Sequence, residues 1–179
     1  DFFIGSCLHD AGAAIAAQWK QSGKVDIGSI ATASAKLVVD TLEEHYGEIP
    51  PESAERLTIC EQSTLVEGLI RGFYKLVWPN LLLQYPAIVA YEKETIFPHD
   101  EQGQLSLKGP FVYMAKPDLL LSNNEDIIYV ELKSTSNKKI EWITSWITAM
   151  QVHGSAKAAE FTLGKPVLGT IVQGMYKGY

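Results

Sequence analysis

The chain has few cysteines and no long hydrophobic run. Cys7 and Cys60 are its only cysteines, too few for a disulfide framework or for a four-cysteine iron–sulfur cluster. We therefore expect a reducing, intracellular and cytoplasmic setting. No uninterrupted run of about 18 apolar residues occurs, so no transmembrane helix and no membrane partner are expected. Residues 1–4 lack the basic charge of a secretory signal.

An excess of positive charge is also missing. The formal net charge is −6: residues 1–70 carry four Lys/Arg against eleven Asp/Glu (−7), and residues 71–179 carry eleven against ten (+1). A processive or very tight DNA binder would be more basic. A metal-dependent nuclease remains compatible, because the bound cation neutralises its own carboxylate ligands.

The length predicts one domain with a substantial core. With 179 residues, of which 46% are hydrophobic, the chain is within the range of a single globular domain. We expect an N-terminal helical half over about residues 1–85 and a sheet with a following helix over about residues 86–179. The fold class this implies is α/β, with a mixed central sheet flanked by helices.

The segment from Asp118 to Glu131 predicts a β-hairpin. Two apolar runs, 119–121 and 127–130, are separated by the turn-forming residues 122–126. A carboxylate lies at the outer end of each strand, where burial would cost several kcal/mol without compensation. A hard divalent cation, bound by both carboxylates, is the compensation that we expect.

Lys133 is the third charged residue of this segment. Residues two apart on a strand share a face, so Glu131 and Lys133 project together while Leu132 faces the core. An ammonium beside a bound metal could orient an attacking water or stabilise charge on a phosphate. The competing interpretation is an ordinary cross-strand ion pair at a solvated edge.

The pattern Pro117-Asp118 followed by Glu131-Leu132-Lys133 resembles the PD-(D/E)XK nuclease superfamily. Two further features resemble its RecB-like branch: Gly5 followed four residues later by His9, and Gln151 after the lysine strand. The family helix usually carries a tyrosine four residues after the glutamine, where this chain has Ser155.

The resemblance implies a restriction-endonuclease-like core and a Mg²⁺- or Mn²⁺-dependent deoxyribonuclease, with exonuclease action favoured. The implied metal ligands are His9, Asp118, Glu131 and the backbone carbonyl of Leu132. Lys133 and Gln151 complete the implied catalytic set. Glu94 is a secondary candidate, because these nucleases often carry a glutamate on the strand before the Pro-Asp hairpin.

The implied partner is DNA, at linear or single-stranded ends, with a protein partner or a second copy of the chain as further candidates. Lys138-Lys139 is the best short basic patch for DNA contact, although a solvated loop pair is the alternative. Recombination, repair, replication and defence all use such nucleases. The rival from another class is a catalytically inactive scaffold that binds nucleic acid or docks a protein.

Two His-Asp dipeptides suggest a second interpretation, a different class of metal-dependent enzyme. His9-Asp10 and His99-Asp100 resemble the metal-binding pairs of HD phosphohydrolases, which need further histidines on packed helices. His99 instead lies in residues 97–103, which are typical of a turn. His9 belongs to an expected amphipathic helix over about Ser6–Gln21, where it is either a boundary residue or a ligand.

The rest of the chain alternates helical and strand patterns. Helical spacing predicts helices from Gly28 to Tyr46, over the stripe from Leu65 to Leu76 ended by Pro79, and from Ile140 to Gly154. Trp142 and Trp146 lie beside this last stripe. Single strands are predicted over Ile88–Phe97, Phe111–Met114 and Val167–Met175.

Overall fold

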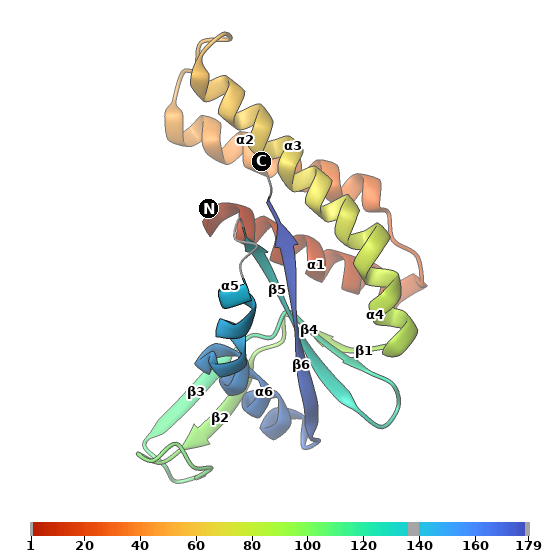
Figure 1. Ribbon diagram of the computed structural model, residues 1–179, viewed down its shortest axis with the longest axis vertical. Coiled ribbons are helices and arrows are strands. Elements are labelled where there is room, and N and C mark those ends of the chain that lie inside the picture. Colours follow the sequence, from red (N-terminus) through yellow and green to blue (C-terminus); the bar gives the residue numbers. More distant parts are fainter. Residues whose placement is uncertain (1, 136–139, 178–179) are drawn as a thin grey trace. The chain divides into compact units, whose positions relative to one another are not determined.

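The computed structural model describes residues 2–135 and 140–177 of the chain (Figure 1). The fold is mixed α/β, with helices flanking a mixed sheet, as predicted. Two compact units are present: Asp1–Leu83 with Leu132–Ser136 and Gly174–Tyr179, and Gln84–Glu131 with Asn137–Gln173. We call them the helical unit and the sheet unit. The first boundary between them along the chain falls after Leu83.

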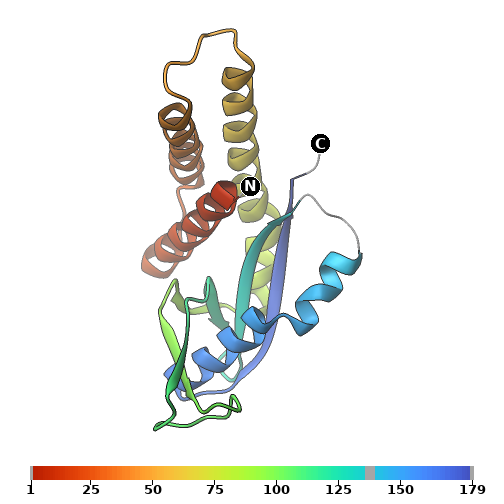
Figure 2. The same ribbon diagram turned by 90° about the vertical axis from the view of Figure 1, so that its left-hand side faces the viewer.

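The helical unit contains α1 (Phe2–Ser22), α2 (Ile27–Tyr46) and α3 (Ala54–Gly72), of which α2 and α3 run antiparallel (Figure 2). Asp26 begins α2 by accepting a hydrogen bond from the Ser29 N–H at 3.0 Å. Gly47, with φ of 75°, ends that helix in the left-handed region that glycine tolerates. The predicted helices over residues 6–21 and 28–46 are confirmed.

The predicted end of the third helix at Pro79 is wrong. A π-helical turn, η1 (Phe73–Val77), follows α3, and α4 (Trp78–Gln84) continues beyond Pro79. In this turn the Trp78 N–H bonds to the Phe73 carbonyl, five residues back. Pro79 has no N–H to donate, and the wider π turn directly before α4 coincides with this gap in the helical hydrogen bonds.

The buried residues of the helical unit include Leu132 and Met175, which both lie on strands. Leu132 is buried, and its Cδ1 lies only 2.6 Å from where a Cβ on Gly12 of α1 would stand. Glycine at position 12 therefore lets the helix approach the strand closely. The other core side chains come from α1, α2, α3 and α4 and include Leu8, Ile15, Val38, Ile59, Val66, Ile70 and Trp78.

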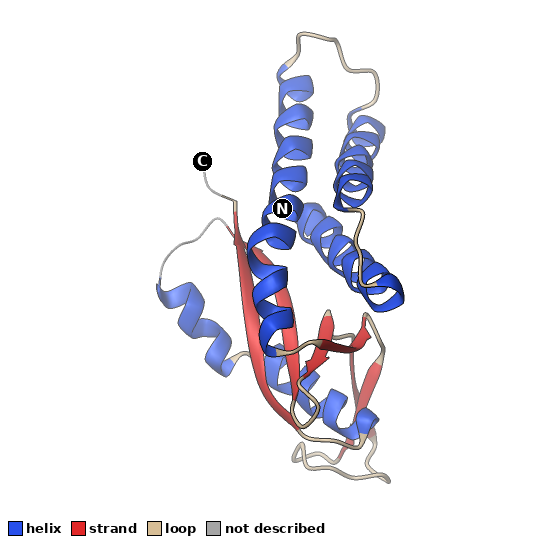
Figure 3. Cartoon of the chain, turned by 90° about the vertical axis from the view of Figure 1, so that its right-hand side faces the viewer, coloured by secondary structure: helices blue, strands red, loops and turns tan. Residues whose placement is uncertain are grey.

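The main sheet has the order β1-β4-β5-β6. Figure 3 shows the strands in red. Its strands are β1 (Ala87–Tyr91), β4 (Leu119–Ser122), β5 (Ile127–Thr135) and β6 (Val167–Tyr176). The β1–β4 and β4–β5 pairs are antiparallel, and β6 runs in the same direction as β5 (Figure 1). The predicted hairpin around residues 122–126 and the predicted closing strand are both confirmed. The turn contains Asn124 at φ of 84°.

The expected single strand over residues 88–97 is wrong, because the chain leaves the main sheet after Tyr91. Glu92 has φ of 45°, which ends the extended conformation. The next strand, β2 (Thr95–His99), pairs with β3 (Phe111–Ala115) in a separate two-stranded sheet. The strand predicted over residues 111–114 is confirmed.

The predicted helix over residues 140–154 is two helices instead. α5 (Ile140–Ser145) and the 3-10 turn η2 (Trp146–Thr148) end at Ala149, whose ψ of 119° is extended. Next, α6 (Met150–Leu163) extends well past Gly154 and packs its small residues Ser155, Ala158 and Ala159 inward. The apolar stripe that suggested one helix points outward at Ile147 and Met150, which are 68% and 81% exposed.

The core of the sheet unit lies between the main sheet and α6. Ala90, Leu120, Ile127 and Tyr129 of the sheet pack with Ala159 of α6. On the same helix, Gly154 faces the ring of Tyr113 on β3. None of the helices in the described ranges is long and apolar enough to cross a membrane.

Candidate functional site

Three acidic residues lie at one level of the main sheet: Glu92 directly after β1, Asp118 directly before β4 and Glu131 on β5. The last registered pairs are Tyr91↔Leu119 on β1–β4 and Leu119↔Val130 on β4–β5. One step further, the register places Glu92 opposite Asp118 and Asp118 opposite Glu131. We call these three residues the carboxylate row. It crosses the sheet at one level and lies entirely in the sheet unit.

Burial distinguishes the carboxylate row from an ordinary acidic surface. Asp118 is 4% exposed and Glu131 is 2% exposed. Residues directly opposite each other on antiparallel strands have Cβ atoms only about 5 Å apart, so like charges there destabilise the sheet unless they are compensated. The predicted pairing of Asp118 with Glu131 across the hairpin is therefore consistent with the register.

Glu92 is the member of the row that sequence reasoning missed. Its N–H donates to the Asp118 carbonyl at 3.2 Å, which ties the end of β1 to the start of β4. Its carboxylate accepts from the Lys116 ammonium at 2.6 Å, with the Glu92 side chain 21% exposed and that of Lys116 63% exposed. The positive φ at Glu92 is uncommon for a residue other than glycine and marks a backbone that its surroundings hold in place.

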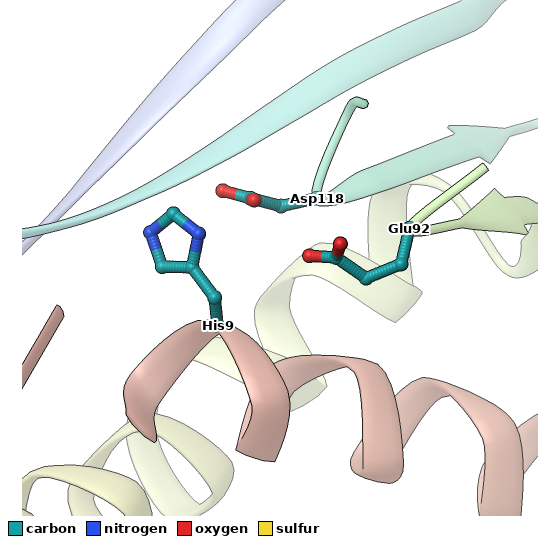
Figure 4. Close-up of side chains that lie close together, drawn as sticks. All are labelled: His9, Glu92 and Asp118. Atoms are coloured by element: carbon teal, nitrogen blue, oxygen red, sulfur yellow. The ribbon is translucent and has the colours of Figure 1, made fainter. Parts of the chain in front are cut away.

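The carboxylates of Glu92 and Asp118 come close enough to share a cation. Each offers an oxygen, and the two lie within 4.8 Å of each other. Figure 4 shows both side chains and labels His9 with them. Carboxylate oxygens are the ligands that Mg²⁺ and Mn²⁺ prefer, so this donor set suits the predicted ion.

Glu131 makes a different contact. Its Oε1 accepts a hydrogen bond at 2.9 Å from Nε2 of Gln151, in the first turn of α6. The resemblance implied a catalytic role for Gln151, and in the structure its side-chain amide holds a carboxylate of the row. Lys133 lies two residues after Glu131 on β5, on the same face of the strand, and is half-buried.

His9 belongs to the helical unit. It projects from the first half of α1 and is partly exposed. The same helix packs through Gly12 on Leu132, the residue that follows Glu131 along β5. Coordination of the same ion by His9 remains a prediction, as does coordination by the Leu132 carbonyl.

The other sequence candidates lie elsewhere. Glu94 is exposed in the break between β1 and β2, and its role as a ligand remains a prediction. Lys138 and Lys139 lie outside the described residues. His99 ends a strand rather than standing on a helix, and its Nδ1 contacts the Asp100 carbonyl at 2.7 Å. This location does not fit the histidine pairs of HD phosphohydrolases.

The two cysteines take no part in the carboxylate row. Cys7 is buried on α1, and burial raises the pKa of its thiol, with a further increase from the nearby Asp10 carboxylate. A raised pKa leaves less of the reactive thiolate at neutral pH. Cys60 is a free, exposed thiol on α3.

No protein-family model matches the chain. No curated protein sequence matches it significantly either.

Proposed function

We propose that this protein is a metal-dependent phosphodiester hydrolase that acts on DNA. The observation that carries the proposal is the carboxylate row, in which two nearly fully buried carboxylates and a third partly buried one lie at the same level of three neighbouring strands. Like charges so close together, where water is largely excluded, destabilise the fold, and that cost makes a purely structural role for the three acidic residues unfavourable. A bound divalent cation removes that cost.

Asp118 and Glu92 would hold the cation directly, and the resemblance to PD-(D/E)XK nucleases adds Glu131, the Leu132 carbonyl and His9. A bound Mg²⁺ or Mn²⁺ supplies Lewis acidity, which lowers the pKa of water and stabilises negative charge on phosphate. Lys133, on the same face of β5 as Glu131, would orient the attacking water with its ammonium. Gln151 would fix the orientation of Glu131 through the hydrogen bond described above.

One observation favours the inactive scaffold as the second candidate. The ammonium of Lys116 lies 2.6 Å from the Glu92 carboxylate and provides a positive charge without any metal. A chain that had lost its metal could keep the row neutralised in this way. However, Lys116 is 63% exposed, so its ammonium can move away when a cation binds.

The test combines cleavage with metal binding. End-labelled linear DNA and a closed circle of the same sequence are incubated with Mn²⁺ or Mg²⁺ and with wild type, Asp118→Ala or Lys133→Ala. Lys75→Ala is the matched control, because Lys75 is an exposed lysine on η1 in the helical unit, outside the carboxylate row. Thermal unfolding of each variant with and without Mn²⁺ measures binding.

We expect wild type and Lys75→Ala to cleave DNA and to be stabilised by Mn²⁺. Asp118→Ala should lose both properties, whereas Lys133→Ala should keep the stabilisation and lose roughly a hundredfold or more of the rate. Loss of linear DNA alone would indicate an exonuclease, and loss of both substrates an endonuclease. Equal behaviour of wild type and Asp118→Ala in both assays would contradict the proposal and leave the scaffold.

A further inference from the structure

A second site lies in the sheet unit, in a groove between β2 and the C-terminal half of α6. Its volume is about 360 Å³, within the range of roughly 300–1,000 Å³ typical of small-molecule sites. Phe97, Phe161 and Leu105 form its apolar walls, and the charged residues Lys157, Glu160 and Lys165 complete it. None of these residues belongs to the carboxylate row.

Phe97 is one end of a column of stacked aromatic rings. Its ring stacks on that of His99, with centroids 6.3 Å apart and planes 19° from parallel. The His99 ring stacks in turn on Phe111, at 5.5 Å and 22°. The β2–β3 pairing fixes this column. Phe97 and His99 lie two residues apart on β2 and so share a face, and Phe111 of β3 is the registered partner of His99. The groove therefore has a rigid, flat wall.

The charges around this wall favour an anion. The Lys157 ammonium stands 5.7 Å from the centroid of the Phe97 ring, and Lys165 is exposed in the turn after α6. Glu160 is the opposing charge, but its Oε1 already accepts from the Val167 N–H at 2.9 Å. Two lysines and one glutamate leave the groove with a net charge of +1.

We propose that this groove binds one nucleotide of a single DNA strand, with the base on Phe97 and the adjoining phosphate at Lys157 and Lys165. The proposal rests on the proposed function, since it names the strand that a DNA hydrolase would hold outside its metal site. A base has a flat π-face for the wall, and its phosphate supplies the anion that the two lysines attract. Lys157 has a long, exposed side chain, so its ammonium can move from the Phe97 ring to the phosphate when the base stacks on that ring.

The test measures binding without cleavage. Fluorescence anisotropy in EDTA and low salt follows two labelled probes, an oligothymidylate and an abasic strand of the same length that keeps the phosphates and lacks bases. The variants are Phe97→Leu, which keeps an apolar side chain without a ring, and Lys165→Glu. Lys75→Glu is the matched control, with the same charge change at an exposed site in the helical unit.

Wild type should bind the oligothymidylate more tightly than the abasic strand. Phe97→Leu should weaken oligothymidylate binding roughly tenfold and leave the abasic strand unchanged, because only the stacking contact is lost. Lys165→Glu should weaken both probes, and Lys75→Glu neither. Wild-type affinity for the oligothymidylate in Phe97→Leu or in Lys165→Glu would overturn the proposal, as would equal binding of the two probes by wild type.

Thermal unfolding checks that each variant is folded. If Phe97→Leu fails to fold, Lys165→Glu remains decisive, because Lys165 is exposed and no ion pair or hydrogen bond of this residue is found in the described part of the chain. Asp118→Ala separates this site from the metal site: it should abolish cleavage and leave binding in EDTA intact. The expected binding pattern without any cleavage would sustain the groove and refute the hydrolase. Cleavage without the expected binding pattern would support the hydrolase and refute the groove.

Discussion

At the scale of single residues, the backbone of Glu92 departs most from what its side chain would choose. A non-glycine residue in the left-handed region carries a cost of order 1 kcal/mol or more, and Glu92 has φ of 45°. Glycine would remove that cost. A glutamate in this conformation, next to Asp118, is what a site selected for function rather than for stability would contain.

Replacing Glu92 by glycine and by alanine separates strain from function. Both variants lose the carboxylate and the Lys116 ion pair, but only glycine relaxes the backbone. We therefore expect denaturant titrations to give Glu92→Gly a free energy of unfolding about 1 kcal/mol higher than that of Glu92→Ala. Both should lose stabilisation by Mn²⁺. An alanine variant as stable as the glycine variant would show that the backbone at residue 92 carries no strain.

Asp26 links stability to pH at the start of α2. Hydrogen bonds from the Ser29 N–H and hydroxyl lower the pKa of its carboxyl below 3.8, although the group is fully exposed. A lowered folded-state pKa means that the folded protein binds fewer protons than the unfolded chain, so the stabilisation is present at neutral pH and is lost as pH falls through that pKa.

Asparagine tests this link, because it caps a helix about as well and does not titrate. In denaturant titrations over a pH series, the advantage of wild type over Asp26→Asn should shrink as pH falls below about 4. A constant difference across the series would show that the carboxylate charge contributes nothing to folding.

The sequence located most of the residues of the carboxylate row but not their partners. Asp118 and Glu131 were identifiable because charges at the ends of apolar strands are conspicuous. Glu92 was not identifiable, because no local sequence pattern predicts the left-handed conformation that ends the strand there. The sequence predicted a single strand that contains both Glu92 and Glu94. Gln151 was correctly placed near the row, yet its bond to Glu131 depends on where α6 begins, which tertiary packing decides.

At the scale of elements, α6 depends on glycine at its contact with β3. A Cβ on Gly154 would stand 2.6 to 2.9 Å from two ring carbons and the hydroxyl oxygen of Tyr113, a rigid neighbour. We expect Gly154→Ala to lower the free energy of unfolding by about 1–2 kcal/mol, since overpacking outweighs the gain in helix propensity.

Gly68 provides the matched control. It lies inside α3, exposed, with nothing within 4 Å of an added Cβ. Gly68→Ala should therefore raise the free energy of unfolding, by up to about 1 kcal/mol. In Gly154→Ala, the added substitution Tyr113→Leu should recover part of the loss. A Gly154→Ala variant stabilised like Gly68→Ala would mean that α6 does not depend on this close contact.

Elements with local signals were predicted, and those set by distant contacts were not. The hairpin 119–135, the helix from Ile27 to Tyr46 and its glycine end all follow from turn residues, caps and periodicity. The break at Ala149 and the π turn at 73–77 have no such signal. Around Ala149 the apolar spacing indicated one continuous helix. In the structure α6 instead packs on β2 and β3 through its small residues, and Ile147 and Met150 point outward.

At the scale of the whole molecule, strands β5 and β6 each belong to both units. The boundary in β5 falls between Glu131 and Leu132, and the boundary in β6 between Gln173 and Gly174. Leu132 is nearly fully buried in the core of the helical unit, while Glu131 is buried in the sheet unit. The core of the helical unit is therefore complete only when β5, which also belongs to the sheet unit, is formed.

This sharing predicts a single cooperative unfolding transition. Separate domains joined by a linker can unfold one after the other, but unfolding the sheet unit releases β5, removes Leu132 from the helical core and destabilises α1 as well. Calorimetry should give one peak whose calorimetric and van't Hoff enthalpies agree. Leu132→Ala, which should cost about 2–5 kcal/mol, should shift the whole peak to lower temperature without splitting it. Two resolved peaks, with only one moved by Leu132→Ala, would show that the helical unit unfolds independently of the sheet unit.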